Sequence, residues 1–228
     1  MVKIIAAGII SVVISYLLGS CNSSIIVVRL LKHEDIREKG SKNAGLTNTL
    51  RCYGKFPALL TLIGDLCKGI VSVMLSILVF RLMVGNGNFD RQTVGYISGI
   101  AAIVGHIFPI YYGFRGGKGI LVSSSILIVI DPLTFVIIIP FFAVVLLISK
   151  YVSVASISAA VFYPILTFLL HYFVENEPLS TCIVHTALVA VTSVLLIYMH
   201  RANIQRLKNG TENKFFGKKK QEGENKNG

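Results

Sequence analysis

A glycine-rich, cationic stretch between two apolar segments carries the clearest chemistry in this chain. Residues 113–119 contain four glycines together with Arg115 and Lys118. Because glycine has no side chain to shield the backbone, N–H groups in such a loop are open to an anion, and a lysine beside them adds positive charge. Its position predicts a loop that lies at a membrane surface or dips into it. The alternative is a flexible turn that carries ordinary cytoplasmic positive charge.

A second candidate site is residues 40–51, where small residues, amides and hydroxyls leave the backbone accessible. Arg51 at its end can hold a phosphate through two parallel hydrogen bonds. The alternative is a helix-capping loop, in which Ser41 or Thr47 is the N-cap and Arg51 is a surface charge. A third candidate follows the last apolar run, where His200 and Asn203 share a face if the helix continues. The alternative for His200 is that it complements the negative end of that helix.

Two charged residues, Asp65 and Lys68, fall inside an apolar segment at a spacing that allows a salt bridge within one helix. Charges within a membrane are costly, so they mark a functional pathway or a pair that satisfies itself. We favour a structural pair, which would hold Arg51 or Lys118 in position.

Several catalytic patterns are absent from the sequence. The loop fails as a Walker motif, because Tyr112 stands at its first glycine position and Gly119 replaces the Ser or Thr that binds magnesium. There is no HxxxxD, GxSxG or HExxH motif, and no metal-ligand spacing among the cysteines or carboxylates. His33, His171 and His185 are isolated, and no function is expected of them. An enzyme with anion-binding groups but no strong base or nucleophile needs a substrate that is already activated.

The composition sets the class of protein that must position these groups. Of 228 residues, 54% are hydrophobic and 14% are charged, whereas a soluble domain has about 25% charged residues. The mean hydropathy of +0.71 predicts an all-α, polytopic membrane protein. A net charge of +11 could indicate nucleic-acid binding, but the charges gather in loops and the tail of an otherwise apolar chain. Orientation in a membrane and an anionic substrate explain the charge better.

Seven apolar runs predict about seven transmembrane helices. The fourth run is short for a full crossing and ends at Asp131 and Pro132. Seven crossings would place the two termini on opposite sides of the membrane. The runs are residues 4–28, 57–84, 92–112, 119–130, 133–149, 154–174 and 181–199.

Loop charge predicts the orientation. Lysine and arginine are concentrated in residues 29–55, in residues 113–118 and after residue 200, which places these parts in the cytoplasm and the N-terminus outside. All three candidate sites then lie on one side of the membrane. We expect one membrane domain over residues 1–212, followed by a basic, disordered cytoplasmic tail over residues 213–228.

Taken in order, these segments resemble the PlsY family, the bacterial acyl-phosphate:glycerol-3-phosphate acyltransferases. The resemblance extends to about residue 214. The matching motifs are SYLLGS at 15–20, GSKNAGLTN at 40–48 with Arg51, DLCKG at 65–69, GHIFP at 105–109, GGKG at 116–119, HRANI at 200–204 and GTE at 210–212.

The resemblance implies transfer of a fatty acyl group from acyl phosphate to the 1-hydroxyl of glycerol 3-phosphate, with lysophosphatidate as the product. It also implies a multi-pass protein of the bacterial inner membrane, no cofactor, no metal and no thioester donor, with the acyl-phosphate synthase as a possible partner. The implied catalytic residues are Ser41, Arg51, Lys118, His200 and Asn203. The implied substrate-binding residues are Asn43, Gly45, Thr47, Asn48, Gly116, Gly117 and Gly119. The implied structural residues are Asp65, Lys68 and Glu212.

The chain departs from the family pattern without losing a proposed catalytic group. Lys42 stands in place of a glycine, which bears on how closely the first loop can wrap a phosphate. One alternative function is a small transporter for phosphorylated anions. Two observations argue against it: the cationic loops all lie on one side of the membrane, and the sequence has no internal repeat. A structural membrane subunit is a second alternative, and it leaves the paired glycines and the intramembrane charges unexplained.

Overall fold

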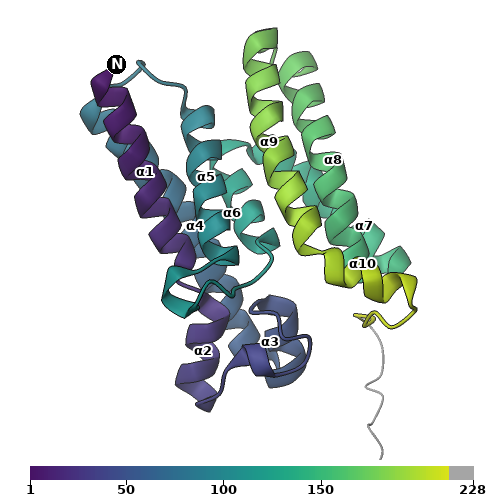
Figure 1. The fold of residues 1–228 in the computed structure, drawn as a ribbon. Coiled ribbons are helices and arrows are strands. Elements are labelled where there is room, and N and C mark those ends of the chain that lie inside the picture. Colours follow the sequence, from purple (N-terminus) through teal and green to yellow (C-terminus); the bar gives the residue numbers. More distant parts are fainter. Residues whose placement is uncertain (216–228) are drawn as a thin grey trace, which may run out of the picture.

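The structure is a computed structural model that describes residues 1–215, and every regular element in that range is helical. Residues 216–228 of the predicted disordered tail lie outside the described part. Figure 1 shows long helices side by side, with shorter elements gathered at one end. The elements are α1 (Val2–Ser20), α2 (Ser23–Lys32), η1 (Ile36–Glu38), α3 (Leu46–Tyr53), α4 (Lys55–Met83), α5 (Arg91–Ile107), η2 (Ile110–Tyr112), α6 (Ile120–Ile130), α7 (Pro132–Ser149), α8 (Val152–Phe173), α9 (Leu179–Met199) and α10 (Arg201–Lys208).

The prediction of an all-helical, multi-pass membrane protein is confirmed, and the predicted number of about seven spans is approximate. Within residues 1–215, six helical segments are long and apolar enough to cross a membrane. The fourth predicted run, which was expected to be short, forms α6 with 11 residues. At 1.5 Å per residue it extends about 16 Å, roughly half of a 30 Å hydrocarbon core. It ends at Asp131, whose side chain accepts a hydrogen bond from Thr134 N and caps α7.

The first apolar run does not form one continuous helix. The structure ends α1 at Ser20 and begins α2 at Ser23, inside the run predicted over residues 4–28. Asn22 causes the break, because its side chain accepts a hydrogen bond from Ile25 N at 3.1 Å and caps a new helix. The break separates α1 from α2, which lies beside α3 at the end of the bundle drawn lowest in Figure 1. We call this end, formed by α2, α3 and α10, the polar end.

The long helices pack as two groups that meet along α5, α6 and α9. In the first group α1 packs against α4 and α5, and α4 against α6; in the second, α8 packs against α7 and α9. Buried side chains from both groups form the main core, among them Ile103, Val122, Tyr163 and Leu196. The N-terminus lies at the end of the bundle opposite α10 (Figure 1).

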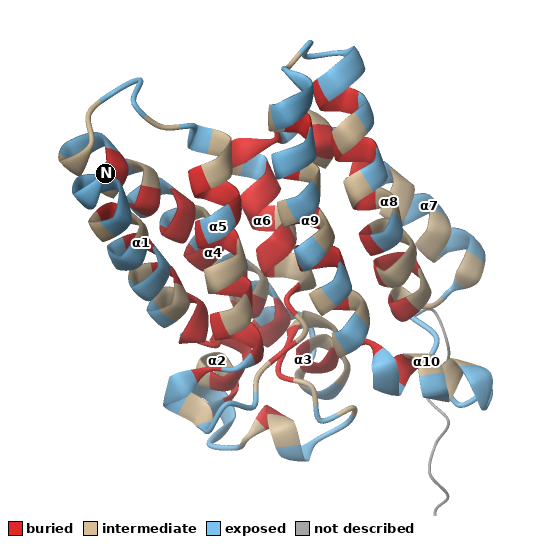
Figure 2. Ribbon diagram, turned by 45° about the horizontal axis from the view of Figure 1, so that its top comes forward, coloured by how far each residue is buried: buried red, intermediate tan, exposed pale blue. Residues whose placement is uncertain are grey.

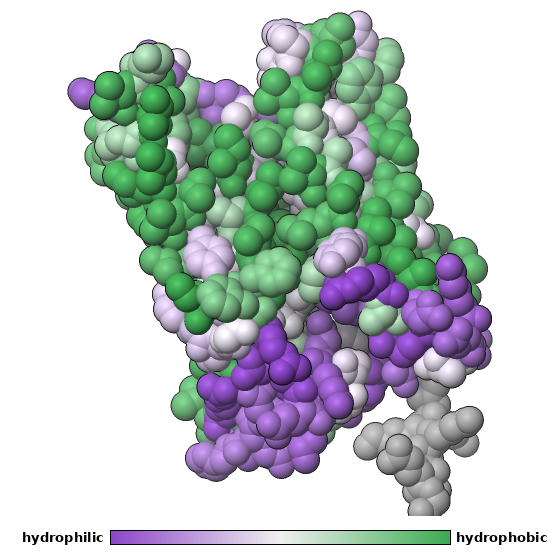
Figure 3. Space-filling view, viewed as in Figure 1, coloured by the Kyte–Doolittle hydropathy of each residue, from purple (hydrophilic) through white to green (hydrophobic). Residues whose placement is uncertain are grey.

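Large apolar side chains cover the outside of the bundle. Ile9 on α1, Leu147 on α7 and Val194 on α9 are all more than half exposed. Buried positions follow the inner faces of the helices (Figure 2), while on the face drawn in Figure 3 a broad hydrophobic belt lies above the hydrophilic polar end. Such a belt matches a lipid environment, in which apolar surface needs no protein partner.

Candidate active site

A cavity of about 450 Å³ lies at the polar end and extends between the two helix groups. It has a polar mouth, where loops from three distant parts of the sequence meet. Most of the residues predicted to be catalytic or to bind substrate line it. These are Ser41, Asn43, Gly45, Thr47, Asn48, Arg51, Lys118, Gly119, His200 and Asn203.

A chain of hydrogen bonds fixes two of these residues against each other. Lys118 Nζ donates to Asn203 Oδ1, and Asn203 Nδ2 donates to Glu212 Oε1 at 2.6 Å. Glu212 also accepts from Ser153 Oγ at 2.9 Å and forms an ion pair with Arg206 at 2.6 Å. Because the carboxylate holds the amide nitrogen, the amide oxygen of Asn203 must face the ammonium. Glu212 therefore positions Asn203 and joins α8, α10 and the lysine loop.

The environment of Lys118 makes its charge sensitive to pH. Burial lowers the pKa of its ammonium to about 8, with smaller contributions from the positive charges of Arg206 and Arg51, while Glu212 acts in the opposite direction. At neutral pH Lys118 still carries its proton. A bound phosphate would strengthen that preference, because an anion favours the charged form.

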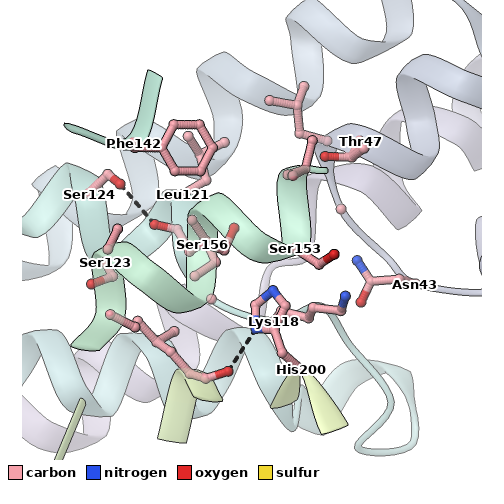
Figure 4. A pocket seen from close by; sticks show the side chains of 18 of the residues that line it. Asn43, Thr47, Lys118, Leu121, Ser123, Ser124, Phe142, Ser153, Ser156 and His200 are labelled. Atoms are coloured by element: carbon pink, nitrogen blue, oxygen red, sulfur yellow. Dashed lines mark hydrogen bonds between the residues drawn. The ribbon is translucent and has the colours of Figure 1, made fainter. Parts of the chain in front are cut away.

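His200 is buried beside Lys118 and is held in one orientation. Its Nδ1–H donates to the carbonyl oxygen of Leu196 at 2.8 Å, which leaves Nε2 as an acceptor. Burial and the nearby charge of Lys118 lower the pKa of His200 to about 4. Figure 4 shows His200 and Lys118 side by side, with Asn43 beyond the lysine nitrogen. His200 is thus neutral at pH 7 and suited to accept a hydrogen bond from a hydroxyl group.

Arg51 reaches the cavity from the last turn of α3. Among residues 1–215 its guanidinium has no hydrogen bond and no ion pair, in contrast to Arg37, which is bound to Asp35. An arginine without a carboxylate partner at the mouth of a cavity keeps its donors available for a phosphate.

The first loop owes its shape to Asn48, which the sequence analysis had assigned to substrate binding. Its Oδ1 accepts from Ser41 N at 2.9 Å, and its Nδ2 donates to Lys39 O at 3.0 Å. The side chain is buried and committed to the backbone of the loop, so Asn48 holds the loop in place. Lys42 has a φ of 59° there, a left-handed conformation that a glycine adopts more easily.

The expectation that Gly116 and Gly117 offer their N–H groups to an anion is corrected by the structure. Gly116 N donates to Ile107 O at 3.0 Å, and Gly117 N donates to His106 O at 3.1 Å. Neither glycine lines the cavity. Their lack of a side chain serves close packing instead, because a Cβ on Gly117 would collide with the His106 ring and with Ala44 O.

Other amide groups near the cavity include those at the start of α6. Gly119 is the N-cap of this helix, and Gly119, Ile120 and Leu121 line the cavity. The first N–H groups of an α-helix have no partner within the helix, and they carry its positive dipole end. The loop therefore presents Lys118 and the N-terminus of α6 to the cavity.

Asp65 and Lys68 form a buried ion pair at 2.8 Å, as their spacing predicted. Lys68 Nζ also contacts His106 Nδ1 at 2.8 Å and donates to Cys21 O at 3.2 Å. The pair is thus joined to His106, and neither Arg51 nor Lys118 is its partner. The sequence analysis did not single out His106, although it stands in the GHIFP motif before the loop that it supports.

Beyond its polar mouth the cavity becomes apolar and extends between α6, α7 and α8. Its walls there are side chains of Leu127, Ile138, Phe142 and Ala160. A cationic mouth joined to an apolar channel within the bundle fits a phosphorylated head group with an attached hydrocarbon chain. Fold and site together define an integral membrane protein with a cavity suited in shape and charge to a phosphorylated, lipid-like anion.

Comparison with known proteins gives the family. The family model described as Glycerol-3-phosphate acyltransferase matches residues 9–210. The glycerol-3-phosphate acyltransferase of Clostridioides difficile is 39% identical over 92% of this chain and 97% of its own length, and that of Chlorobaculum tepidum is 36% identical over 91% and 97%. This chain belongs to the glycerol-3-phosphate acyltransferase family.

Solved structures agree with this assignment. The crystal structure of PlsY, an integral membrane glycerol 3-phosphate acyltransferase, in its glycerol 3-phosphate form matches with a TM-score of 0.74. The two proteins are 30% identical, and the match covers 91% of this chain and 95% of that one. The lysophosphatidic acid form of PlsY matches with a TM-score of 0.71 at 28% identity. The resemblance predicted from the sequence motifs is confirmed.

Proposed function

We propose that this protein transfers a fatty acyl group from acyl phosphate to the 1-hydroxyl of glycerol 3-phosphate, yielding lysophosphatidate and inorganic phosphate. The observation that carries the proposal is the shape of the cavity, in which a cationic mouth continues into an apolar channel. Both the acyl donor and the product have a phosphorylated head and a hydrocarbon chain. The solved PlsY structures are named for a glycerol 3-phosphate form and a lysophosphatidic acid form, which supports glycerol 3-phosphate as the acceptor and lysophosphatidate as the product.

The chemistry of the cavity favours an activated donor. An acyl phosphate is a mixed anhydride, and its phosphate leaves readily when an alcohol attacks. The reaction then needs positioning, neutralisation of two phosphates and stabilisation of the tetrahedral oxyanion. Positive charge and N–H donors come from Arg51, Lys118 and the N-terminus of α6, which line the cavity where the two phosphates and the oxyanion would lie.

In the proposed step, the 1-hydroxyl oxygen attacks the acyl carbonyl carbon, and the bond between that carbon and the bridging oxygen of the phosphate then breaks. Arg51 and Lys118 bind the glycerol 3-phosphate, while Ser41 and Asn203 orient it. His200 Nε2 accepts a hydrogen bond from a substrate hydroxyl. The acyl chain lies along Leu127 and Ile138.

A substrate phosphate is the better acceptor for the hydroxyl proton. The pKa of His200 is about 4. The second pKa of a phosphate monoester in water is about 6, which is above that of His200. The phosphate also lies beside cations that hold it in place. We therefore assign the proton to the phosphate and the alignment of the hydroxyl to His200.

The remaining features of the proposal concern the setting. Residues 1–212 would form the acyltransferase domain in a bacterial inner membrane, with the N-terminus outside and the polar end in the cytoplasm. This orientation follows from the lysine and arginine content of the loops at the polar end. An acyl-phosphate synthase could deliver the donor there, because both substrates enter at that face.

The direct test is an acyl-transfer assay with purified protein in detergent or lipid. Labelled glycerol 3-phosphate is offered with palmitoyl phosphate or with palmitoyl-CoA, in the presence of a chelator. Lysophosphatidate from the acyl phosphate alone is the expected result. Product only from the thioester would overturn the donor assignment, and saturable binding of glycerol 3-phosphate without product would favour the transporter.

A further inference from the structure

Two buried histidines meet at the end of the bundle opposite the polar end. His171 on α8 and His185 on α9 have no exposed surface, and their Nδ1 atoms are 3.1 Å apart. Glu177, in the turn between these helices, places its Oε2 3.2 Å from His171 Nδ1 and 3.4 Å from His185 Nδ1. Two ring nitrogens and one carboxylate oxygen therefore converge on a single point.

Carboxylates occupy the other side of each ring. His171 Nε2 is 3.3 Å from Asp131 Oδ2, at the junction of α6 and α7. His185 Nε2 is 2.8 Å from Asp90 Oδ2, at the N-cap of α5. An Nε2–H that donates to a carboxylate leaves the Nδ1 of the same ring with a lone pair. Both Nδ1 lone pairs then face each other, with the Glu177 carboxylate beside them.

Such a convergence of acceptors is unfavourable unless a shared proton or a metal cation lies among them. Glu177 Oε2 is buried and has no hydrogen-bond partner among the described residues. The three atoms are 3.1 to 3.4 Å from one another. Ligands about 2.0–2.1 Å from a tetrahedral zinc ion lie about 3.3 Å apart, so these atoms match one face of a zinc tetrahedron. Histidine ligands of zinc commonly donate their second N–H to a carboxylate, as Asp131 and Asp90 provide here.

We propose that His171 Nδ1, Glu177 Oε2 and His185 Nδ1 bind one divalent metal ion of the zinc class, with Asp131 and Asp90 orienting the two rings. The ion would tie α8 and α9 together at their turn. Through the two orienting carboxylates it would also fasten α5 and the junction of α6 and α7.

The carboxylate side chains around the site reach the surface, although Glu177 Oε2 itself is buried. The Glu177 side chain is 21% exposed and that of Asp90 is 48% exposed, whereas both histidines are closed off. In this proposal a water molecule at the outer face would complete the coordination. The site lies at the opposite end of the bundle from Lys118 and His200, so the metal would take no part in the proposed acyl transfer.

No local sequence motif indicates this site. A bound metal would depart from the expectation of a metal-free protein. The three ligands are six and eight residues apart, and they come from two helices and a turn. Neither spacing belongs to a familiar zinc motif. Only the packing of α8 against α9 brings the histidines together.

The test uses full-length protein purified without a histidine tag. After treatment with EDTA and reconstitution with zinc, elemental analysis should give about one zinc per chain. Zinc should raise the Tm of the stripped protein, and Co²⁺ should give the visible absorption of a tetrahedral site. The initial rate of acyl transfer should change less than twofold between stripped and loaded protein. Less than a tenth of an equivalent of zinc with no shift in Tm would overturn the proposal and leave a shared proton between the histidines.

Variants separate the site from surface binding. Glu177→Gln and His185→Gln should lose the zinc and its effect on Tm, while the exposed control His33→Gln should keep both. Because His185→Gln can weaken folding by itself, Glu177→Gln is the decisive variant, since its side chain is partly exposed and lies outside the helices. Zinc bound equally by Glu177→Gln and by the wild type would contradict the proposed ligand set.

Discussion

The two ends of the bundle contain buried histidines in opposite electrostatic settings. At the polar end His200 lies beside Lys118, and burial and the lysine charge lower its pKa to about 4. At the other end His171 and His185 are surrounded by carboxylates from α5, from the turn after α8 and from the junction of α6 and α7. The first setting attracts an anion and the second attracts a cation. The sign of the neighbouring charges, more than the histidine itself, decides what each site can bind.

The two sites also differ in how much space they enclose. The polar end has a cavity of about 450 Å³ with uncommitted donors, as an enzyme that turns over two substrates requires. At the histidine cluster both rings are buried and the candidate ligand atoms lie within 4.8 Å of one another, as suits a single ion. Substitutions at the polar end should therefore change rates, and substitutions at the opposite end should change stability.

The largest effect is expected for Lys118→Ala. It removes a cation and the donor to Asn203, so kcat/KM for glycerol 3-phosphate should fall about 1,000-fold, equivalent to about 4 kcal/mol of transition-state stabilisation. Steady-state assays of this variant are compared with Lys55→Ala, an exposed lysine at the start of α4. A fall in kcat/KM of less than tenfold, or an equal fall in Lys55→Ala, would contradict the view that the polar end carries the catalytic charges.

A somewhat smaller loss is expected for Arg51→Ala. A charged hydrogen bond to phosphate contributes about 1.5–3 kcal/mol, so kcat/KM should fall about 100-fold, with the Tm unchanged because Arg51 has no partner among residues 1–215. Arg91→Ala, an exposed arginine at the opposite end, is the matched control. A clear drop in Tm without a loss of rate would show that Arg51 supports the fold instead.

The pH dependence should report the charge of Lys118. Its pKa of about 8 means that the free enzyme loses the cation as the pH rises through that value. The profile of kcat/KM should therefore fall about tenfold per unit above pH 8, while kcat at saturating substrate should hold to higher pH, because bound phosphate keeps the lysine protonated. Lys118→Arg should be slower but should lack this alkaline fall. A flat wild-type profile up to pH 10 would contradict the assignment.

Glu212→Gln should reduce the rate by about tenfold through Asn203. The amide of a glutamine cannot accept from Asn203, Ser153 and Arg206 together as the carboxylate does. Removing the negative charge should also move the alkaline fall to lower pH, because Glu212 favours the charged form of Lys118. A pH–rate profile of the variant checks this shift. Ser153→Ala, which loses one hydrogen bond and no charge, should leave the alkaline fall where it is.

The smallest effect on rate at the polar end is expected for His200→Gln. A glutamine can still accept a hydrogen bond from a hydroxyl, so turnover should fall only several-fold, and the shape of the pH profile should not change. Turnover is measured from pH 5 to pH 9 in both proteins. A loss of turnover of about 1,000-fold, or a change in the acidic part of the pH profile, would make His200 the general base. The two ends would then differ in function as well, with a catalytic histidine at the polar end and metal-binding histidines at the other.

The sequence predicted the parts of the structure that depend on local chemistry. Long apolar runs must form helices in a membrane because their backbone groups have no water to bind, and α4, α7, α8 and α9 follow the predicted runs closely. The pairing of Asp65 with Lys68 came from their spacing within one helix. The order of the polar motifs was sufficient to predict the family, which the comparisons confirm.

Other features were decided by contacts between segments that are far apart in the chain. The N–H groups of Gly116 and Gly117 pair with the end of α5, so only the tertiary structure shows that these amides are not free and that the start of α6 lines the cavity. Asn48 binds backbone groups up to 12 residues away, which composition cannot reveal. His171 and His185 become a pair only because α8 and α9 pack side by side. Spacing within a helix is a property of the sequence, whereas the faces that two helices present to each other are settled by the packing of the whole bundle.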